Sequence, residues 1–320
     1  MTTASLVEGV KRRDQRALSR AISIVESAGA ECEELIDRVA GELTHAGFRV
    51  GVTGPPGVGK SSLTGELIKA ARARGETVGV LAVDPTSPVT GGALLGDRLR
   101  MEAALDDAGV YFRSMATRGH VGGLASATAD AADLLDLSGV DRALIETVGV
   151  GQAETEVMGV VDLVVLVLAP GLGDQLQALK AGILEIAQLI VVNKSDLGGA
   201  ERVVADIEDA QSLRREGMAR APVISTSVTG GAGLRELNLT LEQAIAARLH
   251  AADRDEQLVT RRAQRVLRIL KEHVDERWFR DSKLVDDLRA RHRRAAAVPP
   301  YATARETFAR LLSGGLGKVW

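Results

Sequence analysis

The glycine-rich segment at residues 54–62 has the composition of a loop that holds phosphate groups. It reads G-P-P-G-V-G-K-S-S, which contains the pattern G-x-x-x-x-G-K-S. Glycines let backbone N–H groups converge on phosphate oxygens, and the start of a following helix adds partial positive charge. We expect Lys60 to reach the β- and γ-phosphates and Ser61 to bind Mg²⁺. The predicted phosphate-binding residues are Gly54, Pro55, Pro56, Gly57, Val58, Gly59, Lys60, Ser61 and Ser62.

A second motif, N-K-S-D at residues 193–196, predicts which base the nucleotide carries. It fits the N-K-x-D pattern of GTP-binding proteins and lies 139 residues after Gly54. The Asp196 carboxylate can accept hydrogen bonds from the guanine N1–H and exocyclic amine, a pair that adenine does not offer. The Lys194 stem can pack along the base. A later S-T-S strand exit is expected to contact the base too, so the predicted base-binding residues are Asn193, Lys194, Asp196, Ser225, Thr226 and Ser227.

Three carboxylates at or near predicted strand ends are candidate Mg²⁺ ligands, because Mg²⁺ prefers oxygen donors. Asp84 ends an apolar run and opens D-P-T-S-P, and Glu146 opens E-T-V-G, where many GTPases carry D-x-x-G. Asp97 lies in the glycine-rich stretch G-G-A-L-L-G-D-R, which suits a switch that senses the nucleotide. Acids that merely end strands or cap helices are common, so each also has a structural interpretation.

Two further polar loops contain candidate catalytic residues. In E-T-V-G-V-G-Q-A-E, which begins at Glu146, Gly149 is expected to donate its N–H to the γ-phosphate, so that hydrolysis releases the loop. Gln152 or Glu154 is expected to orient the attacking water, and the spacing does not choose between them. A second polar loop, G-L-G-D-Q and onward to Lys180, follows an apolar strand.

Short β-branched runs alternate with helical stretches and position these motifs. Several runs are apolar at consecutive residues, as in parallel strands that helices cover on both faces. The alternation predicts an α/β fold with a doubly wound, mostly parallel sheet. The phosphate loop sits between a strand and a helical stretch at 62–74, which is the context that its motif requires. The predicted strands are Phe48–Thr53, Thr77–Val83, Ala143–Thr147, Leu163–Ala169, Leu189–Val192 and Val223–Ser227.

The chain divides by pattern into three parts. Residues 1–46 have apolar residues at helical spacing, and residues 47–250 contain the strands and motifs of a nucleotide-binding domain. Residues 251–320 read as helical, with 16 Lys and Arg against 10 Asp and Glu, whereas the whole chain has a net charge of −3. The charge and the hydrophobic period change together near residue 250, so we expect a boundary there.

Composition excludes several classes of protein. With 45% hydrophobic and 26% charged residues the chain is not disordered, and a net charge of −3 argues against a nucleic-acid binder. A single cysteine, Cys32, rules out an internal disulfide framework and indicates a reducing compartment. The longest apolar run, Leu163–Ala169, is far shorter than the ~20 residues of a membrane helix. No signal peptide is expected in the first residues, so we expect a cytoplasmic protein that binds no membrane.

The ordered set of motifs resembles the methylmalonyl-CoA mutase-associated GTPases of the MeaB/ArgK type. The resemblance rests on the phosphate loop, on D-P-T-S from Asp84, on T-G-G-A-L-L-G-D-R from Thr90 and on R-G-H-V-G-G from Arg118. It also rests on E-T-V-G-V-G-Q from Glu146 and on N-K-S-D, and it covers nearly the whole chain.

This resemblance implies a P-loop GTPase domain of the signal-recognition and metal-chaperone class, with helical extensions at both ends and a homodimer built through the C-terminal helices. It implies Mg²⁺ contacts from Ser61, Asp84, Asp97 and Glu146, and a third switch at Gly171–Gly182. Its implied partner is adenosylcobalamin-dependent methylmalonyl-CoA mutase, whose cofactor loading the GTPase gates and whose activity it protects. We expect Asp174, Gln175 and Lys180 to transmit the partner's signal. The catalytic candidates are Lys60, Glu146, Gln152, Glu154 and Lys180.

Two alternatives compete with this interpretation. A nickel-insertion GTPase for urease or hydrogenase has the same class of domain but uses Cys and His ligands, and this chain has one Cys and five scattered His. A kinase that phosphorylates a transport protein needs an acceptor site, which the sequence does not indicate. The chain also lacks the D-x-H-x-x-G motif that binds cobalamin, so any cobalamin is expected on the partner.

Overall fold

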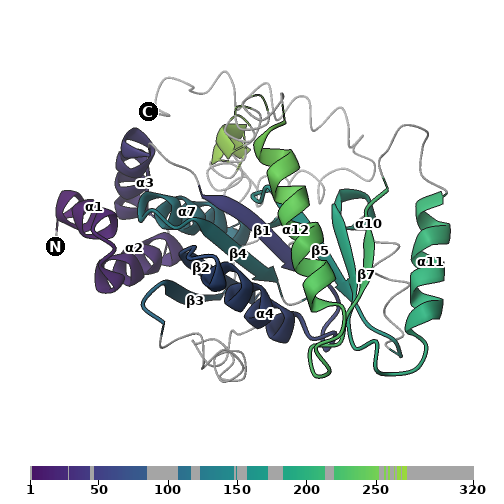
Figure 1. Cartoon of the computed structure of the whole chain (residues 1–320). Helices are drawn as coiled ribbons and strands as arrows, with labels where there is room; N and C mark the ends of the chain where they lie inside the picture. Colours follow the sequence, from purple (N-terminus) through teal and green to yellow (C-terminus); the bar gives the residue numbers. More distant parts are fainter. Residues whose placement is uncertain are drawn as a thin grey trace, which may run out of the picture. The chain divides into compact units, whose positions relative to one another are not determined.

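The computed structural model describes residues 2–27, 29–43, 47–84, 107–116, 123–147, 149, 157–171, 183–212, 220–251 and nine residues between 256 and 271. Contacts divide the chain into two compact units, Met1–Arg262 and Ala263–Trp320. Every strand and helix labelled in Figure 1 belongs to the first unit. In the second unit, the described residues between 263 and 271 are helical. The functional division into 1–46, 47–250 and 251–320 stays a prediction.

Seven parallel strands form one sheet in the order β3-β2-β4-β1-β5-β6-β7 (Figure 1). The strands are β1 (Phe48–Thr53), β2 (Val78–Asp84), β3 (Val110–Ala116), β4 (Arg142–Thr147), β5 (Leu163–Leu168), β6 (Leu189–Val192) and β7 (Val223–Ser225). Strands β1, β4, β5 and β6 are buried at every residue. This confirms the predicted doubly wound α/β fold, and β3 is the described strand that the sequence pattern did not indicate.

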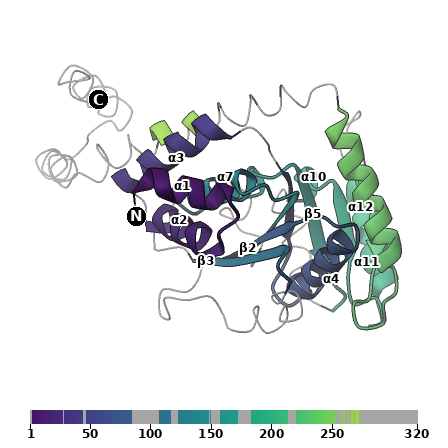
Figure 2. The same cartoon turned by 60° about the vertical axis from the view of Figure 1, so that its left-hand side comes forward.

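Helices cover both faces of the sheet (Figures 1 and 2). On one face, α4 (Lys60–Ala73) and α12 (Leu234–Leu249) pack into a single apolar cluster with the strands. On the other, α7 (Gly123–Leu137) covers β2 and β4, while α10 (Ile183–Ile186) and α11 (Ala200–Ser212) cover β5 and β6. Apolar residues are therefore removed from water on both sides of the strands, which is the main stabilising contribution to this fold.

Three N-terminal helices form a further layer over α7: α1 (Thr3–Lys11), α2 (Gln15–Ser27) and α3 (Ala30–Glu42). In Figure 2 they lie together in purple beside α7. The residues predicted to share one apolar face of α2 are all buried: Leu18, Ile22 and Val25. Because the N-terminal helices cover it, α7 has apolar contacts on its outer side as well as toward the sheet.

A buried ion cluster joins α7 to the start of β1. The Arg49 guanidinium donates to Asp133 and to Asp136, each at 2.6 Å, and the Gly47 N–H donates to Asp136 Oδ1 at 3.1 Å. The side chains of Arg49 and Asp136 are almost fully buried. Burial makes each charge depend on its partner, since neither can be solvated by water.

We expect Asp136→Ala to lower the free energy of unfolding by about 3 kcal/mol, because it leaves Arg49 buried with one partner fewer. Urea unfolding measures the change. A matched control is Glu66→Ala, which removes an exposed pair with Lys69 and is expected to cost at most ~1 kcal/mol. Equal effects of the two substitutions would show that the buried cluster does not stabilise the fold.

Candidate functional site

The predicted phosphate loop lies at the carboxyl end of β1 and leads directly into α4. Gly54 and Gly59 have φ angles of +149° and +93°, in the range that favours glycine. A Cβ atom on Gly54 would lie 2.0 Å from the carbonyl oxygen of Val167, and one on Gly59 would lie 2.5 Å from Asn193 Nδ2. The glycines are therefore required for close packing of the loop against β5 and the N-K-S-D segment.

Lys60, the first residue of α4, folds its side chain back over the loop. Its Nζ donates hydrogen bonds to the carbonyl oxygens of Gly54 at 2.8 Å and Pro55 at 2.9 Å. The side chain is buried, so these bonds hold the ammonium group inside the curve of the loop. A cation held there, at the N-terminus of a helix, is suited to binding phosphate oxygens.

Ser61 and Glu146 meet beside the phosphate loop, one from α4 and the other from β4. The Ser61 hydroxyl donates to Glu146 Oε1 at 2.6 Å, and both residues are buried. Strands β1 and β4 are neighbours, with Val52 opposite Glu146, which explains why two distant motifs come together. A hydroxyl and a carboxylate in contact form an oxygen donor pair, the kind of ligand that Mg²⁺ takes. These two residues therefore fit a Mg²⁺ ion.

The other predicted metal ligands are only partly covered by the structure. The backbone of Asp84 ends β2, the strand next to β4, so it lies at the same edge of the sheet as Glu146. The side chain of Asp84 is not among the described parts of the structure. Asp97 also lies outside the described residues, as do Gln152, Glu154, Asp174, Gln175 and Lys180. Their roles stay predictions.

The N-K-S-D segment contacts the phosphate loop directly. Asn193 Nδ2 donates to the carbonyl oxygen of Val58 at 2.9 Å, and Lys194 Nζ donates to that of Gly57 at 2.7 Å. Lys194 has a φ of +58°, which is uncommon for a residue with a side chain. Such strained conformations persist where surrounding contacts enforce them, often at functional sites. The two predicted halves of the nucleotide site thus form one connected structure.

The S-T-S strand exit supports this segment from the other side. Thr226 Oγ1 donates to Asn193 Oδ1 at 3.2 Å, and the Ser195 N–H donates to the Thr226 carbonyl at 2.9 Å. A hydrogen bond with the Ser227 side chain lowers the pKa of the Asp196 carboxyl from its ordinary value. Asp196 is exposed and stays ionised at neutral pH, as reading guanine requires.

Sequence reasoning did not single out Thr53 and Thr147, the last residues of two neighbouring strands. Thr147 Oγ1 donates to Thr53 Oγ1 at 2.9 Å, and Thr53 Oγ1 donates to the carbonyl oxygen of Gly149 at 3.0 Å. These bonds attach the predicted γ-phosphate sensor, Gly149, to the end of β1. Their positions in the sequence could have identified them, because Thr53 directly precedes the phosphate loop and Thr147 lies within E-T-V-G.

A parallel sheet with a phosphate loop after β1 and an N-K-x-D segment after β6 defines a P-loop protein of the GTPase class. The chain belongs to the family described as methylmalonyl Co-A mutase-associated GTPase MeaB, whose model matches residues 18–283. This confirms the family that the motifs indicated. Among the described residues, no helix combines the length and the apolar character that a membrane crossing needs.

The chain is similar in sequence to proteins from an archaeon, a mammal and a bacterium. A candidate GTPase of Pyrococcus abyssi is 49% identical over 236 residues, covering 72% of each chain. The mouse mitochondrial protein named methylmalonic aciduria type A homolog is 40% identical over 256 residues, which is 74% of this chain and 62% of that one. GTPase ArgK of Escherichia coli is 37% identical over 201 residues, or 61% of this chain and 60% of its own.

The fold also matches a solved structure over almost its whole length. The crystal structure of a LAO/AO transport system kinase superposes with a TM-score of 0.73 and covers 97% of this chain and 98% of its own. The two sequences are 23% identical, so this match shows the fold alone.

Proposed function

We propose that this protein is a GTP-hydrolysing chaperone that gates the loading of adenosylcobalamin into methylmalonyl-CoA mutase, or a related acyl-CoA mutase, and protects that enzyme. The observation that carries the proposal is the direct bonding of the N-K-S-D segment to the phosphate loop, in a chain of a family named for association with this mutase. The name of the mouse relative, which refers to methylmalonic aciduria, also supports a role connected with methylmalonyl-CoA mutase. The proposal includes a homodimer formed through residues 251–320.

In this proposal the nucleotide binds with its phosphates against the backbone N–H groups of the loop and the start of α4. Lys60 turns its ammonium group from the loop carbonyls to the phosphate oxygens. Asp196 accepts from the guanine edge, with Ser227 holding its carboxylate. These residues bind and orient GTP, while Gly149 senses the γ-phosphate.

Ser61 and Glu146 would hold Mg²⁺, with Asp84 and Asp97 as further proposed ligands. Ser61 supplies the hydroxyl of the proposed set, directly beside the Glu146 carboxylate. When bound, Mg²⁺ neutralises charge that develops on the β- and γ-phosphate oxygens. The Ser61 hydroxyl, which now donates to Glu146, would have to turn its oxygen lone pair toward the ion.

Glu146→Ala and Asp84→Ala are expected to reduce Mg²⁺-dependent GTP turnover by about 10- to 100-fold, the effect typical of groups that support a metal site. GDP binding should fall much less, because the phosphate loop and Asp196 remain. Turnover assays over a range of Mg²⁺ concentrations, with calorimetry for GDP, separate the two effects. Normal hydrolysis in both variants would show that these acids serve only the structure.

The proposed partnership is tested by measuring GTP turnover with and without the cognate mutase. We expect modest turnover for the protein alone and faster turnover when the adenosylcobalamin-dependent mutase is added, because the partner would stabilise the arrangement around the γ-phosphate in which hydrolysis occurs. A mutase that lacks bound cobalamin and an unrelated acyl-CoA enzyme serve as controls. No stimulation by any form of the mutase would remove the partner from the proposal and leave the GTPase.

A further inference from the structure

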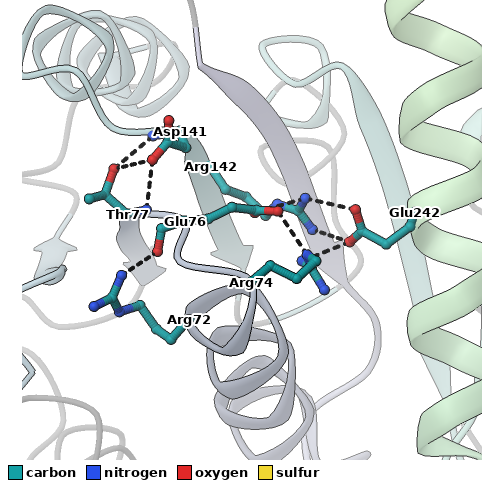
Figure 3. Close-up of polar contacts among 7 residues, drawn as sticks. All are labelled: Arg72, Arg74, Glu76, Thr77, Asp141, Arg142 and Glu242. Carbon is teal, nitrogen blue, oxygen red and sulfur yellow. Dashed lines mark hydrogen bonds and ion pairs between the residues drawn. The ribbon is translucent and has the colours of Figure 1, made fainter.

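Four charged side chains form a closed ring at the amino ends of β2 and β4 (Figure 3). The nucleotide motifs follow the carboxyl ends of the strands, at the opposite edge of the sheet. Arg142 donates to both carboxylate oxygens of Glu242, at 2.6 and 3.1 Å, and pairs with Glu76 at 2.9 Å. Arg74 pairs with Glu242 at 2.8 Å and donates to Glu76 at 2.8 Å. We call Arg74, Glu76, Arg142 and Glu242 the basal ring.

The basal ring is more protected than an ordinary surface ion pair. The Arg142 side chain is only 6% exposed, so its charge depends on the two carboxylates that it contacts. Beside the ring, Thr77 Oγ1 donates to Asp141 Oδ2 at 2.7 Å and the Asp141 N–H donates to Thr77 Oγ1 at 3.1 Å. These bonds, also drawn in Figure 3, fix the amino end of β4 to that of β2.

Two members of the ring lie on elements that also reach the nucleotide site. Helix α4 begins with Lys60 and Ser61 in the phosphate loop and is followed at its other end by Arg74. Strand β4 begins with Arg142 in the ring and carries Glu146, which contacts Ser61. A 14-residue helix is about 20 Å long, so α4 and β4 are connected at two well-separated points. One is the direct contact of Ser61 with Glu146, and the other is the ring, where Arg74 and Arg142 share the carboxylates of Glu76 and Glu242.

The fourth member, Glu242, connects this pair of elements to α12. Helix α12 packs on the sheet through Leu237, Leu241 and Ile245, which are apolar contacts without directional preference. Glu242 adds a directional link, because its carboxylate is held by Arg142 of β4 and by Arg74, the residue directly after α4. After α12 the chain continues into residues 251–320, the segment predicted to mediate assembly.

We propose that the basal ring couples the nucleotide state to the position of α12. Nucleotide and Mg²⁺ must change the Ser61–Glu146 contact, which shifts the first turn of α4 against β4. Because α4 and β4 are rigid elements, the shift reaches Arg74 and Arg142 and changes how the two arginines share Glu242. This inference rests on the proposed GTP-dependent function. It implies that a change of nucleotide changes the surface of the molecule that carries α12.

Hydrogen–deuterium exchange of the full-length protein tests the coupling, with GDP or a non-hydrolysable GTP analogue bound. In the unmodified protein, we expect the exchange of Leu234–Leu249 to differ between the two states. Glu242→Gln should abolish this difference while both nucleotides still bind, with the ratio of their affinities changed by the coupling that is lost. Glu66→Gln, which neutralises an exposed pair on α4, should keep the full difference.

A second variant keeps the test decisive if Glu242→Gln folds poorly. Arg74→Gln leaves the two-bond contact between Arg142 and Glu242 and is expected to reduce the exchange difference. A full difference in a folded Glu242→Gln or Arg74→Gln variant would overturn the proposal, as would identical exchange of α12 in both states of the unmodified protein. Nucleotide titrations on the same samples separate this outcome from failure of the proposed function, in which the GTP analogue would not bind.

Discussion

Asp196→Asn is expected to weaken GTP binding by at least ~2 kcal/mol, or about 30-fold, because hydrogen bonds to a charged group are lost. The variant should bind xanthosine triphosphate better than the unmodified protein does. The xanthine 2-oxo group accepts a hydrogen bond where guanine carries an amine that donates one, and the asparagine amide can donate to it. Competition binding with GTP, xanthosine triphosphate and ATP measures the change.

Ser195→Ala is the matched control for this substitution. Ser195 lies within the same motif and its described contact is a backbone N–H bond to Thr226, which alanine retains. Its affinity for GTP should therefore stay close to that of the unmodified protein. Equal affinity of the unmodified protein for ATP and GTP would contradict the assignment of Asp196 as the residue that reads guanine.

Lys60→Ala is expected to reduce GTP turnover by about 100-fold or more, the scale of losing one preorganised charge-stabilising donor. The Lys60 ammonium group is held within the loop by two carbonyl oxygens, whereas Lys194 reaches the loop from the N-K-S-D segment at Gly57. Single-turnover kinetics separate the loss in the chemical step from the loss in binding. The fold should survive, since the loop carbonyls can accept hydrogen bonds from water instead.

Lys69→Ala provides the comparison on the same helix. Lys69 is exposed and pairs with Glu66, so its removal takes one positive charge from α4 without touching the phosphate loop. We expect turnover near that of the unmodified protein. A similar decrease in both variants would mean that net charge, and not the placement of Lys60, determines the rate.

Much of the nucleotide site was predictable because its motifs depend on local chain geometry. The run Phe48–Thr53 and the loop after it coincide with β1 and the turn into α4. The contact between Ser61 and Glu146 follows from β1 and β4 being neighbours, which the alternation of strands and helices permits but does not specify. The predicted strand Val223–Ser227 ends earlier, at Ser225, because Thr226 and Ser227 leave the sheet to support Asn193 and Asp196.

Strand β3 and helix α7 were not predicted, for two different physical reasons. In β3, Tyr111 and Arg113 face α2, where they contact Ser19 and Glu26, so this edge strand lacks a continuous apolar run. Helix α7 is covered by the N-terminal helices as well as by the sheet, and two acids on its polar side, Asp133 and Asp136, bind the buried Arg49 instead of facing water. Both outcomes depend on contacts between segments far apart in the sequence.

The burial of two arginines could not be predicted from the sequence for the same reason. Arg49 is the second residue of β1 and Arg142 is the first of β4, and both look in the sequence like solvated residues near strand ends. In the structure each is buried and held by two carboxylates, from α7 in one case and from Glu76 and α12 in the other. Long-range ion pairs of this kind carry no local signal, which is why the basal ring emerged only from the folded chain.

The transfer of adenosylcobalamin to a cofactor-free methylmalonyl-CoA mutase tests nucleotide gating most directly. The transfer is followed spectroscopically with the GTPase absent, bound to GDP, bound to GTP, or bound to a non-hydrolysable GTP analogue. We expect the rate or extent of loading to depend on which nucleotide is bound, and the Asp196→Asn variant to show that dependence with xanthosine nucleotides instead. Loading that is the same in every nucleotide state and without the protein would contradict the proposed function.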